Sequence, residues 1–292
     1  MRDAQSSPYF RVPRPLNPHA PLLFYLPGMD GTGQLLSRQL AGLEQAFDIR
    51  CLTLPPDDLT PWETLTTQVV NLIEAELAHG TQQPTYLCGE SFGGCLALKV
   101  MERSPHLFDR LILLNPATSF KQSFWIYWGS YLVQPLPDPI YQTSCVGFLP
   151  FLAALERIEA SDRRALLDAM QSVTQKASLW RMSLLREFEL PDAVIRSLQK
   201  PALLIASQRD RLLPSVNEAS RLASLLPNAQ IQLLPQSGHA CLLEADVDLY
   251  DILKVNQFLQ PSHLADTTRR QNTPQPPAPS AEHKAEQKNV MA

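Results

Sequence analysis

A serine between two glycines is the residue of this sequence best suited to covalent chemistry. Residues 89–93 read GESFG, with Ser91 at the centre, between an apolar run at 85–88 and an apolar helical pattern at 95–100. A GxSxG sequence between a strand and a helix is typical of a nucleophile elbow, where the glycines permit a strained turn that presents the serine hydroxyl. We therefore predict that Ser91 is a nucleophile.

A serine hydroxyl needs a neighbouring base to attack efficiently, and histidine is the usual base near neutral pH. Of the six histidines, His239 follows the last strand-like run, whereas the others lie in the tails or near expected helix ends. Asp210 follows the preceding strand-like run, and an aspartate there would hold the imidazole tautomer and stabilise the imidazolium. The chain order serine, acid, histidine is that of α/β hydrolases. We predict a triad of Ser91, Asp210 and His239, with Glu244 as the first alternative acid.

Acyl transfer also needs two N–H donors that stabilise the oxyanion of the tetrahedral intermediate. The backbone of Phe92, next after Ser91, is one expected donor. The second should come from the glycine-rich loop 27–33, where we predict the N–H of Met29, with that of Asp30 as the alternative. This loop has no GxGxxG pattern and no following Gly-Lys-Ser/Thr, so we do not expect a nucleotide site.

Short apolar runs alternate with helical patterns along the chain, which predicts a mostly parallel sheet with helices on both faces. The expected strands are 22–26, 49–54, 85–88, 110–114, 202–206 and 230–234. Two helices are expected to begin with capping boxes, one at Thr60 and one at Ser215. Together with the elbow, this pattern predicts an α/β-hydrolase fold.

Strand spacing and proline content divide the chain further. The segment from about 119 to 198 separates two expected strands by far more than a crossover needs, so we predict an inserted helical cap there. It belongs to a hydrolase domain at 21–260. Residues 1–20 are expected to form a proline-rich N-terminal arm. Residues 261–292, which lack aromatic residues and glycine, are expected to form a disordered tail.

The expected cap is rich in aromatic residues, among them Trp125 and Trp128. Two interpretations stay open for these side chains. They form the core of the cap against the sheet, or part of them remains exposed and anchors the protein at a lipid surface, because indole combines an apolar body with a polar tip. The second interpretation predicts peripheral contact with a membrane or a lipid droplet.

Charge balance and cysteine content argue against several classes of protein. With 25 Lys and Arg against 29 Asp and Glu, the net charge is −4, which gives no electrostatic reason to expect nucleic acid as a partner. Five cysteines without a CxxC pair suggest reduced thiols in the cytoplasm rather than disulfides or a zinc site. The sequence has no apolar stretch long enough to span a membrane. We expect neither a metal nor a cofactor.

Several segments resemble the plant phytyl ester synthases and their bacterial relatives, the esterase/lipase/thioesterase family of α/β hydrolases. The matching segments read LPGMDGTG (26–33), CLTLPPDDLTPWE (51–63), YLCGESFGGCLAL (86–98), LILLNPATSF (111–120), LWRMSLLREF (179–188), ASQRDRLLPS (206–215) and SGHACLLE (237–244). They span most of residues 21–258 and correspond to the hydrolase domain only. The resemblance implies that Ser91, Asp210 and His239 form the catalytic triad.

Residues and resemblance together predict a serine hydrolase or acyltransferase that acts on lipid esters through an acyl-enzyme. The resemblance implies hydrolysis of such esters, or acyl transfer to phytol, diacylglycerol or a similar lipid alcohol. A thioesterase acting on acyl-CoA or acyl carrier protein is the second enzymatic interpretation, because only the leaving group differs. A catalytically silent lipid-binding protein of the same fold is the remaining alternative, and it would require a broken triad.

Overall fold

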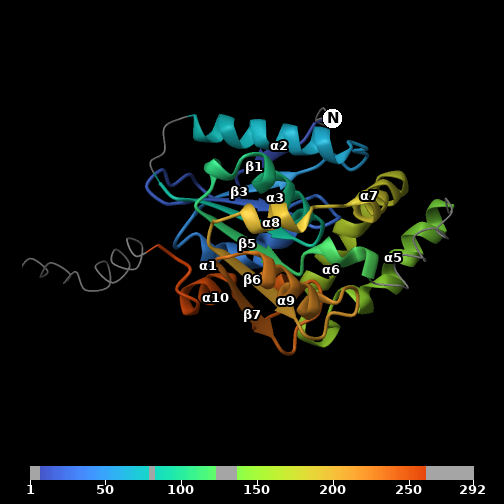
Figure 1. Ribbon diagram of the computed structural model, residues 1–292. Helices are drawn as coiled ribbons and strands as arrows, with labels where there is room; N and C mark the ends of the chain where they lie inside the picture. The colour runs from blue at the N-terminus through green and yellow to red at the C-terminus, as the bar shows by residue number, and fades with distance from the viewer. Residues whose placement is uncertain (1–6, 79–82, 123–136, 261–292) are drawn as a thin grey trace, which may run out of the picture. The chain divides into compact units, whose positions relative to one another are not determined.

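A seven-stranded sheet forms the centre of the protein (Figure 1). The computed structural model describes residues 7–78, 83–122 and 137–260. The strands are β1 (Tyr9–Arg11), β2 (Leu22–Leu26), β3 (Asp48–Thr53), β4 (Thr85–Glu90), β5 (Arg110–Leu114), β6 (Ala202–Ser207) and β7 (Ala229–Leu234). Their order across the sheet is β1-β3-β2-β4-β5-β6-β7, and every neighbouring pair is parallel except β1 with β3. The predicted mostly parallel sheet is confirmed.

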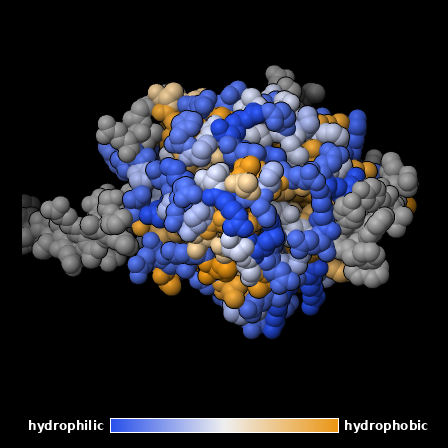
Figure 2. Space-filling view, in the orientation of Figure 1, coloured by the Kyte–Doolittle hydropathy of each residue, from blue (hydrophilic) through white to orange (hydrophobic). Residues whose placement is uncertain are grey.

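Helices cover both faces of the sheet, which is why its central strands are apolar along their length. The helical segments around the sheet are η1 (Gln34–Gln39), α1 (Leu40–Leu43), α2 (Trp62–Leu77), α3 (Phe92–Arg103), η2 (Pro105–Leu107), α9 (Ser215–Leu225), η5 (Cys241–Leu243) and α10 (Leu249–Val255). Phe24 of β2 belongs to the core formed with Val69 of α2 and Leu96 of α3. Tyr86 of β4 points to the opposite face, against the ring of Phe47. The outer surface seen in Figure 2 is mainly hydrophilic, as expected when helices bury the sheet.

Between β5 and β6 the chain forms the helical cap. Its described elements are η3 (Ala117–Gln122), α5 (Asp138–Leu152), η4 (Leu155–Arg157), α6 (Ala160–Ser172), α7 (Gln175–Glu187) and α8 (Asp192–Ser197). Figure 1 shows α5, α6 and α7 gathered to one side, at the right of the view. The indole of Trp180 on α7 donates to the carbonyl of Thr60 at 3.1 Å, and the indole of Trp62 on α2 donates to the carbonyl of Leu184 at 2.8 Å. These bonds tie α7 to the beginning of α2.

Neither predicted capping box forms. Helix α2 begins after Pro61, and the hydroxyl of Thr60 donates to Asp58 instead of capping the helix. Helix α9 begins at Ser215 itself, whose hydroxyl donates to Asp210. Both predictions are wrong for one reason: a carboxylate within reach orients the hydroxyl toward itself, and a hydrogen bond to a charged acceptor is stronger than a neutral one.

Part of the expected N-terminal arm is a strand. Residues 9–11 form β1, which pairs antiparallel with residues 51–53 of β3. The sequence did not predict this strand, because three half-buried residues near prolines are too few to show a periodicity. The tail expected at 261–292 and the aromatic side chains of Trp125 and Trp128 lie outside the described residues, so both remain predictions.

The turn between β4 and α3 is strained at Ser91, whose φ of 53° and ψ of −113° are rare for a residue with a side chain. Backbone hydrogen bonds hold it in place: the N–H of Ser91 donates to the carbonyl of Leu114 at 3.0 Å, and the N–H of Ala117 donates to the carbonyl of Ser91 at 3.0 Å. Gly93 packs so closely against β2 that an added Cβ would overlap the carbonyl oxygen of Leu26. A glycine at position 93 therefore lets α3 cross against the sheet.

The first prediction follows from this close packing. Gly93→Ala should lower the free energy of unfolding by at least about 2 kcal/mol, because β2 must move to make room for the methyl group. Gly147→Ala is the matched control: Gly147 lies inside α5, and apart from its own helix backbone and chain neighbours no atom of the described residues lies within 4 Å of an added Cβ, so alanine should stabilise that helix by about 0.5–1 kcal/mol. Urea unfolding followed by circular dichroism measures both changes. A Gly93 variant as stable as the unaltered protein would contradict the packing argument.

Candidate active site

Three side chains from distant parts of the sequence form a hydrogen-bonded series. His239 Nε2 lies 2.9 Å from Ser91 Oγ, and His239 Nδ1 lies 2.7 Å from Asp210 Oδ2. Ser91 follows β4, Asp210 follows β6, and His239 follows β7, so three parallel strands of one sheet deliver the three side chains to the same edge. Ser91 is 9% exposed and His239 is 5% exposed. The structure thus brings together the three residues predicted as a triad.

Asp210 is held by several donors. Its Oδ1 accepts from the backbone N–H of Leu212 at 2.8 Å and of Leu213 at 3.0 Å, and its Oδ2 accepts from the hydroxyl of Ser215 and faces His239. Burial alone would raise the pKa of this carboxyl, but its interaction with the histidine and the donated hydrogen bonds outweigh burial and lower the pKa. Asp210 is therefore ionised at neutral pH and fixed in orientation.

A second carboxyl group acts on the imidazole. Burial lowers the pKa of His239, but the charges of Asp210 and, more weakly, Glu90 reverse this, so that the net pKa is raised. Glu90 is only 8% exposed and accepts a hydrogen bond from the hydroxyl of Tyr25. Burial raises the pKa of Glu90 to about 6. The second residue of the elbow sequence, directly before Ser91, thus contributes a carboxyl group whose pKa lies near the ordinary pKa of histidine.

Asn115, at the end of β5, holds the backbone of the histidine loop. Its side-chain amide donates to the carbonyl of His239 at 2.8 Å and to the hydroxyl of Ser207 at 2.9 Å, while its Oδ1 accepts from the N–H of Ser207 at 2.8 Å. The residue is fully buried and has a φ of 41°. The sequence assigns Asn115 no role, since an amide cannot replace the acid of a triad. Its place at the end of a buried strand beside the elbow was the available signal.

Glu244, the alternative acid, lies elsewhere. Its carboxylate accepts from the N–H of Gly238 at 2.7 Å and from Arg157 Nε at 2.7 Å, away from the imidazole ring. The residue is fully buried. Because Gly238 precedes His239, this carboxylate shapes the loop that carries the histidine, and the ion pair with Arg157 links that loop to the cap. The loop is tied to the cap a second time by a backbone bond from Ala240 to the end of α5.

The two predicted oxyanion donors belong to segments that lie next to the serine, one directly after it in the chain and one in the loop after β2. Phe92 is the first residue of α3, so its N–H has no acceptor within the helix. A Cβ added to Gly28 would lie 3.7 Å from the Cβ of Ser91, which puts the loop after β2 beside the nucleophile. The carbonyl of Gly28 accepts from the N–H of Gly31 at 3.0 Å. In a trans peptide the N–H points away from the carbonyl, so this turn fixes the direction of the N–H of Met29.

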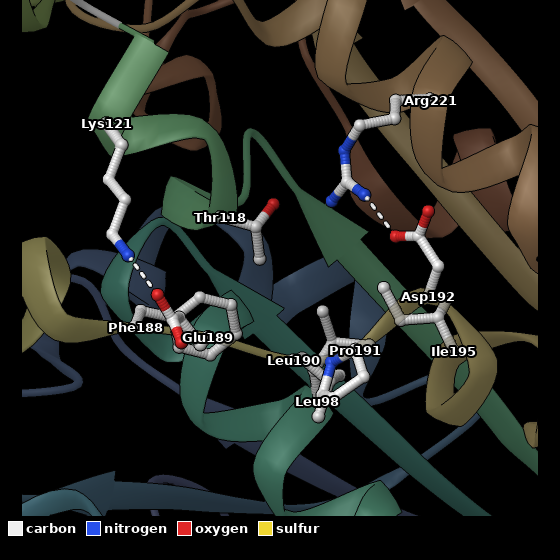
Figure 3. A pocket seen from close by; sticks show the side chains of 10 residues that line it. All are labelled: Leu98, Thr118, Lys121, Phe188, Glu189, Leu190, Pro191, Asp192, Ile195 and Arg221. Carbon is white, nitrogen blue, oxygen red and sulfur yellow. Dashed lines mark hydrogen bonds and ion pairs between the residues drawn. The ribbon is translucent and has the colours of Figure 1, made fainter.

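A hollow of about 360 Å³ opens elsewhere, between α3, α8 and α9 (Figure 3). It is lined by Leu98, Thr118, Lys121, Phe188, Glu189, Leu190, Pro191, Asp192, Ile195 and Arg221. Its two cations are already paired, Lys121 with Glu189 at 2.9 Å and Arg221 with Asp192 at 3.3 Å. None of its lining residues belongs to the predicted triad, so the chemistry is assigned from the hydrogen-bonded series and not from this hollow.

Metal-ligating side chains do not cluster in groups of three or more anywhere in the described part of the chain. The five cysteines, Cys51, Cys88, Cys95, Cys145 and Cys241, are buried free thiols. Burial raises the pKa of Cys51 to about 12, so this thiol is protonated at neutral pH and is a poor nucleophile. The hydroxyl of Ser91, which lies within hydrogen-bond distance of His239, is therefore the group that the histidine activates.

Comparison with known proteins identifies the family of the chain. Residues 58–246 match the family described as serine aminopeptidase, S33 (Hydrolase_4). Phytyl ester synthase 1, chloroplastic, from Arabidopsis thaliana is 32% identical over 278 residues, which cover 83% of this chain and 40% of that protein. Phytyl ester synthase 2, chloroplastic, from the same plant is 30% identical, with 82% and 38% covered. The chain thus spans about two fifths of the length of these curated relatives.

Solved structures share the fold. An esterase, RhEst1, from Rhodococcus sp. ECU1013 superposes with a TM-score of 0.66 at 16% identity, covering 86% of this chain and 93% of that chain. MenH from S. aureus superposes with a TM-score of 0.66 at 13% identity, covering 90% and 99%. These likenesses confirm the predicted α/β-hydrolase fold. The chain belongs to the serine aminopeptidase S33 family of α/β hydrolases, and the phytyl ester synthases are among its relatives.

Proposed function

We propose that this chain is a serine esterase or acyltransferase that acts on lipid esters through an acyl-enzyme. The observation that carries the proposal is the series of hydrogen bonds from Ser91 through His239 to Asp210. A nucleophile, a base and an orienting acid within hydrogen-bond distance make up the arrangement that activates a hydroxyl for acyl transfer. A catalytically silent lipid-binding protein would have no need of this complete arrangement.

In the first half-reaction, Ser91 Oγ attacks the acyl carbonyl carbon while His239 Nε2 accepts the hydroxyl proton. The Nδ1–H of the imidazolium donates to Asp210, which stabilises the positive charge. The backbone N–H groups of Phe92 and Met29 donate to the developing oxyanion. When the tetrahedral intermediate collapses, the leaving alkoxide takes the proton from the imidazolium, and the acyl group remains esterified to the serine.

In the second half-reaction, water or a lipid alcohol gives its proton to His239 and attacks the acyl-enzyme. The tetrahedral intermediate collapses to release Ser91, which recovers its proton from the imidazolium. Water gives a free acid, and an alcohol gives a new ester. The chemistry in the site is the same for both acceptors, so the product depends on which acceptor the enzyme binds beside the acyl group.

The lipid nature of the substrate is supported by the two phytyl ester synthases among the relatives. The chain spans only about two fifths of the length of these relatives, so their activity is not transferred to it directly. We propose two reactions for this chain: hydrolysis of lipid esters, and acyl transfer to phytol, diacylglycerol or a similar lipid alcohol. Location in the cytoplasm belongs to the same proposal, and the free state of the five cysteines supports a reducing compartment.

Peripheral contact with a lipid surface through the cap is a further part of the proposal. Among the helices in the described ranges, none has the length and apolar character needed to cross a membrane. Support for surface contact comes from α5, which carries Ile140, Val146, Phe148 and Phe151 with side chains about half exposed. Exposed aromatic and aliphatic side chains on a helix suit insertion into the boundary between headgroups and acyl chains.

The proposed activity is tested by product analysis. The full chain is incubated with a long-chain acyl ester, with and without phytol or diacylglycerol, and products are identified by mass spectrometry. We expect free acid in both reactions and a new ester only where the alcohol is present, if the enzyme is a transferase. Ser91→Ala should abolish every product and also labelling by a fluorophosphonate probe, which reacts with activated serines. Products or labelling that persist in this variant would contradict the assignment of the nucleophile.

The pH dependence of activity should report the environment of His239. Since only the neutral imidazole acts as a base, and its pKa is raised, kcat/KM should fall on the acid side with an apparent pKa above the ordinary 6.5. Glu90→Gln removes a negative charge that stabilises the imidazolium, so the acid limb should move to lower pH. Glu187→Gln, on the exposed surface of α7, is the control and should leave the profile unchanged. An acid limb that stays in place in the Glu90 variant would show that this carboxyl does not act on the base.

Surface contact is tested with Phe148→Ser combined with Phe151→Ser. We expect binding to phosphatidylcholine vesicles, measured by co-sedimentation, to weaken at least about tenfold, because two exposed rings lose their burial in lipid. Turnover of a short soluble ester should stay the same. The control is Val255→Ser, which removes a side chain 78% exposed on α10 and should not affect vesicle binding. Unchanged vesicle binding in the folded double variant would end this part of the proposal.

A further inference from the structure

Arg181, on α7 of the cap, is the largest fully buried side chain of the described residues, with 1% exposure. No carboxylate in that part of the chain lies within ion-pair distance of its guanidinium; Asp58 and Asp30 act on it only through charge at longer range. Its Nε is buried without a hydrogen-bond partner. Burying a cation with incomplete pairing is costly, and an apolar side chain would fill the same space at lower cost. The hydrogen bonds that the guanidinium does donate therefore have to account for an arginine at this position.

The guanidinium holds two backbone carbonyls that belong to different loops. Its Nη1 donates to the carbonyl of Met29, in the loop after β2, at 2.7 Å, and its Nη2 donates to the carbonyl of Pro55, in the loop after β3, at 2.9 Å. The planar fork of arginine lets one side chain bridge both acceptors in a fixed geometry. Arg181 thereby cross-links the cap to the loop that carries the proposed oxyanion donor.

Hydrogen bonds fix the peptide groups on both sides of Met29. The peptide before this residue is held by the bond from the N–H of Gly31 to the carbonyl of Gly28, and the peptide after it is held by Arg181. With both neighbouring peptides fixed, the backbone of Met29 has little freedom to rotate. Gly31 is fitted to the same arrangement: its φ is 68°, and an added Cβ would lie 2.8 Å from Arg181 Nη1.

We infer that Arg181 is a positioning residue that holds the N–H of Met29 toward the oxyanion, so that the cap helix α7 controls transition-state stabilisation. The inference rests on the proposed function and adds to it a named link between the cap and the reaction centre. A donor displaced from its place in the free enzyme would stabilise the tetrahedral intermediate poorly, while substrate binding, which depends on other contacts, would change little.

The test compares Arg181→Met and Arg181→Lys with Lys176→Met, an exposed residue of the same helix that serves as the matched control. The readouts are kcat and KM for p-nitrophenyl butyrate, the inhibition constant of butylboronic acid, which forms a tetrahedral adduct with an active serine, and the melting temperature. For Arg181→Met we expect kcat to fall about 10²-fold and the inhibition constant to rise by a similar factor, with KM within about threefold. Lysine reaches one carbonyl rather than two, so Arg181→Lys should show a smaller loss of about tenfold.

A purely structural role predicts a different pattern. A folded Arg181→Met variant with kcat near that of the unaltered enzyme, or with lowered kcat and unchanged boronic acid inhibition, would overturn the inference. If that variant does not fold, Arg181→Lys decides the question by the same two readouts, because it keeps the buried cation. The unaltered enzyme must also be labelled by a fluorophosphonate at Ser91. Absence of that label would refute the proposed function itself, whereas normal labelling with unaffected Arg181 variants would refute only the positioning role.

Discussion

Because Ser91 holds a φ of 53° at the end of β4, its hydroxyl leaves the sheet in a direction that a residue of regular strand or helix could not offer. Such a backbone conformation costs of order 1–3 kcal/mol and persists only when the surroundings over-determine it. Here the surroundings are the bonds to Leu114 and Ala117 and the close approach of Gly93 to β2. The buried sheet supplies the stability that keeps this turn strained. The turn fixes the position of Ser91, and the other contacts of the site depend on that position.

The remaining parts of the site are held largely by bonds to backbone. Asn115 and Glu244 hold the carbonyl of His239 and the N–H just before it, and Arg181 holds the carbonyl of Met29. Glu244 is in turn paired with Arg157 of the cap. The cap therefore contacts the loop after β2 through Arg181 and the loop that carries His239 through Arg157. The cap between β5 and β6 thus helps to hold the catalytic loops in position.

The sequence was informative where chemistry and position coincide. Ser91, Asp210 and His239 combine a reactive residue type with a place directly after a buried strand, so a periodicity and a motif were enough to bring them together. Asn115 and Arg181 act on backbone carbonyls, and a backbone carbonyl leaves no trace in the sequence to say which side chain will reach it. The same limit explains the predicted capping boxes: a hydroxyl near a helix start can accept from a backbone N–H or donate to a nearby carboxylate, and only the folded chain decides between the two.

The contrast between Asp210 and Glu90 shows how environment divides the work of two carboxyl groups that act on one imidazole. Asp210 receives backbone and hydroxyl donors on both oxygens in addition to the histidine, which offset its burial and keep it ionised. Glu90 is also buried, but among the described residues only Tyr25 donates a hydrogen bond to its carboxylate, so burial prevails and its pKa rises to about 6. One carboxylate is therefore a constant partner of the proposed base, whereas the charge of the other changes just below neutral pH. The number of donors, rather than the residue type, separates the two roles.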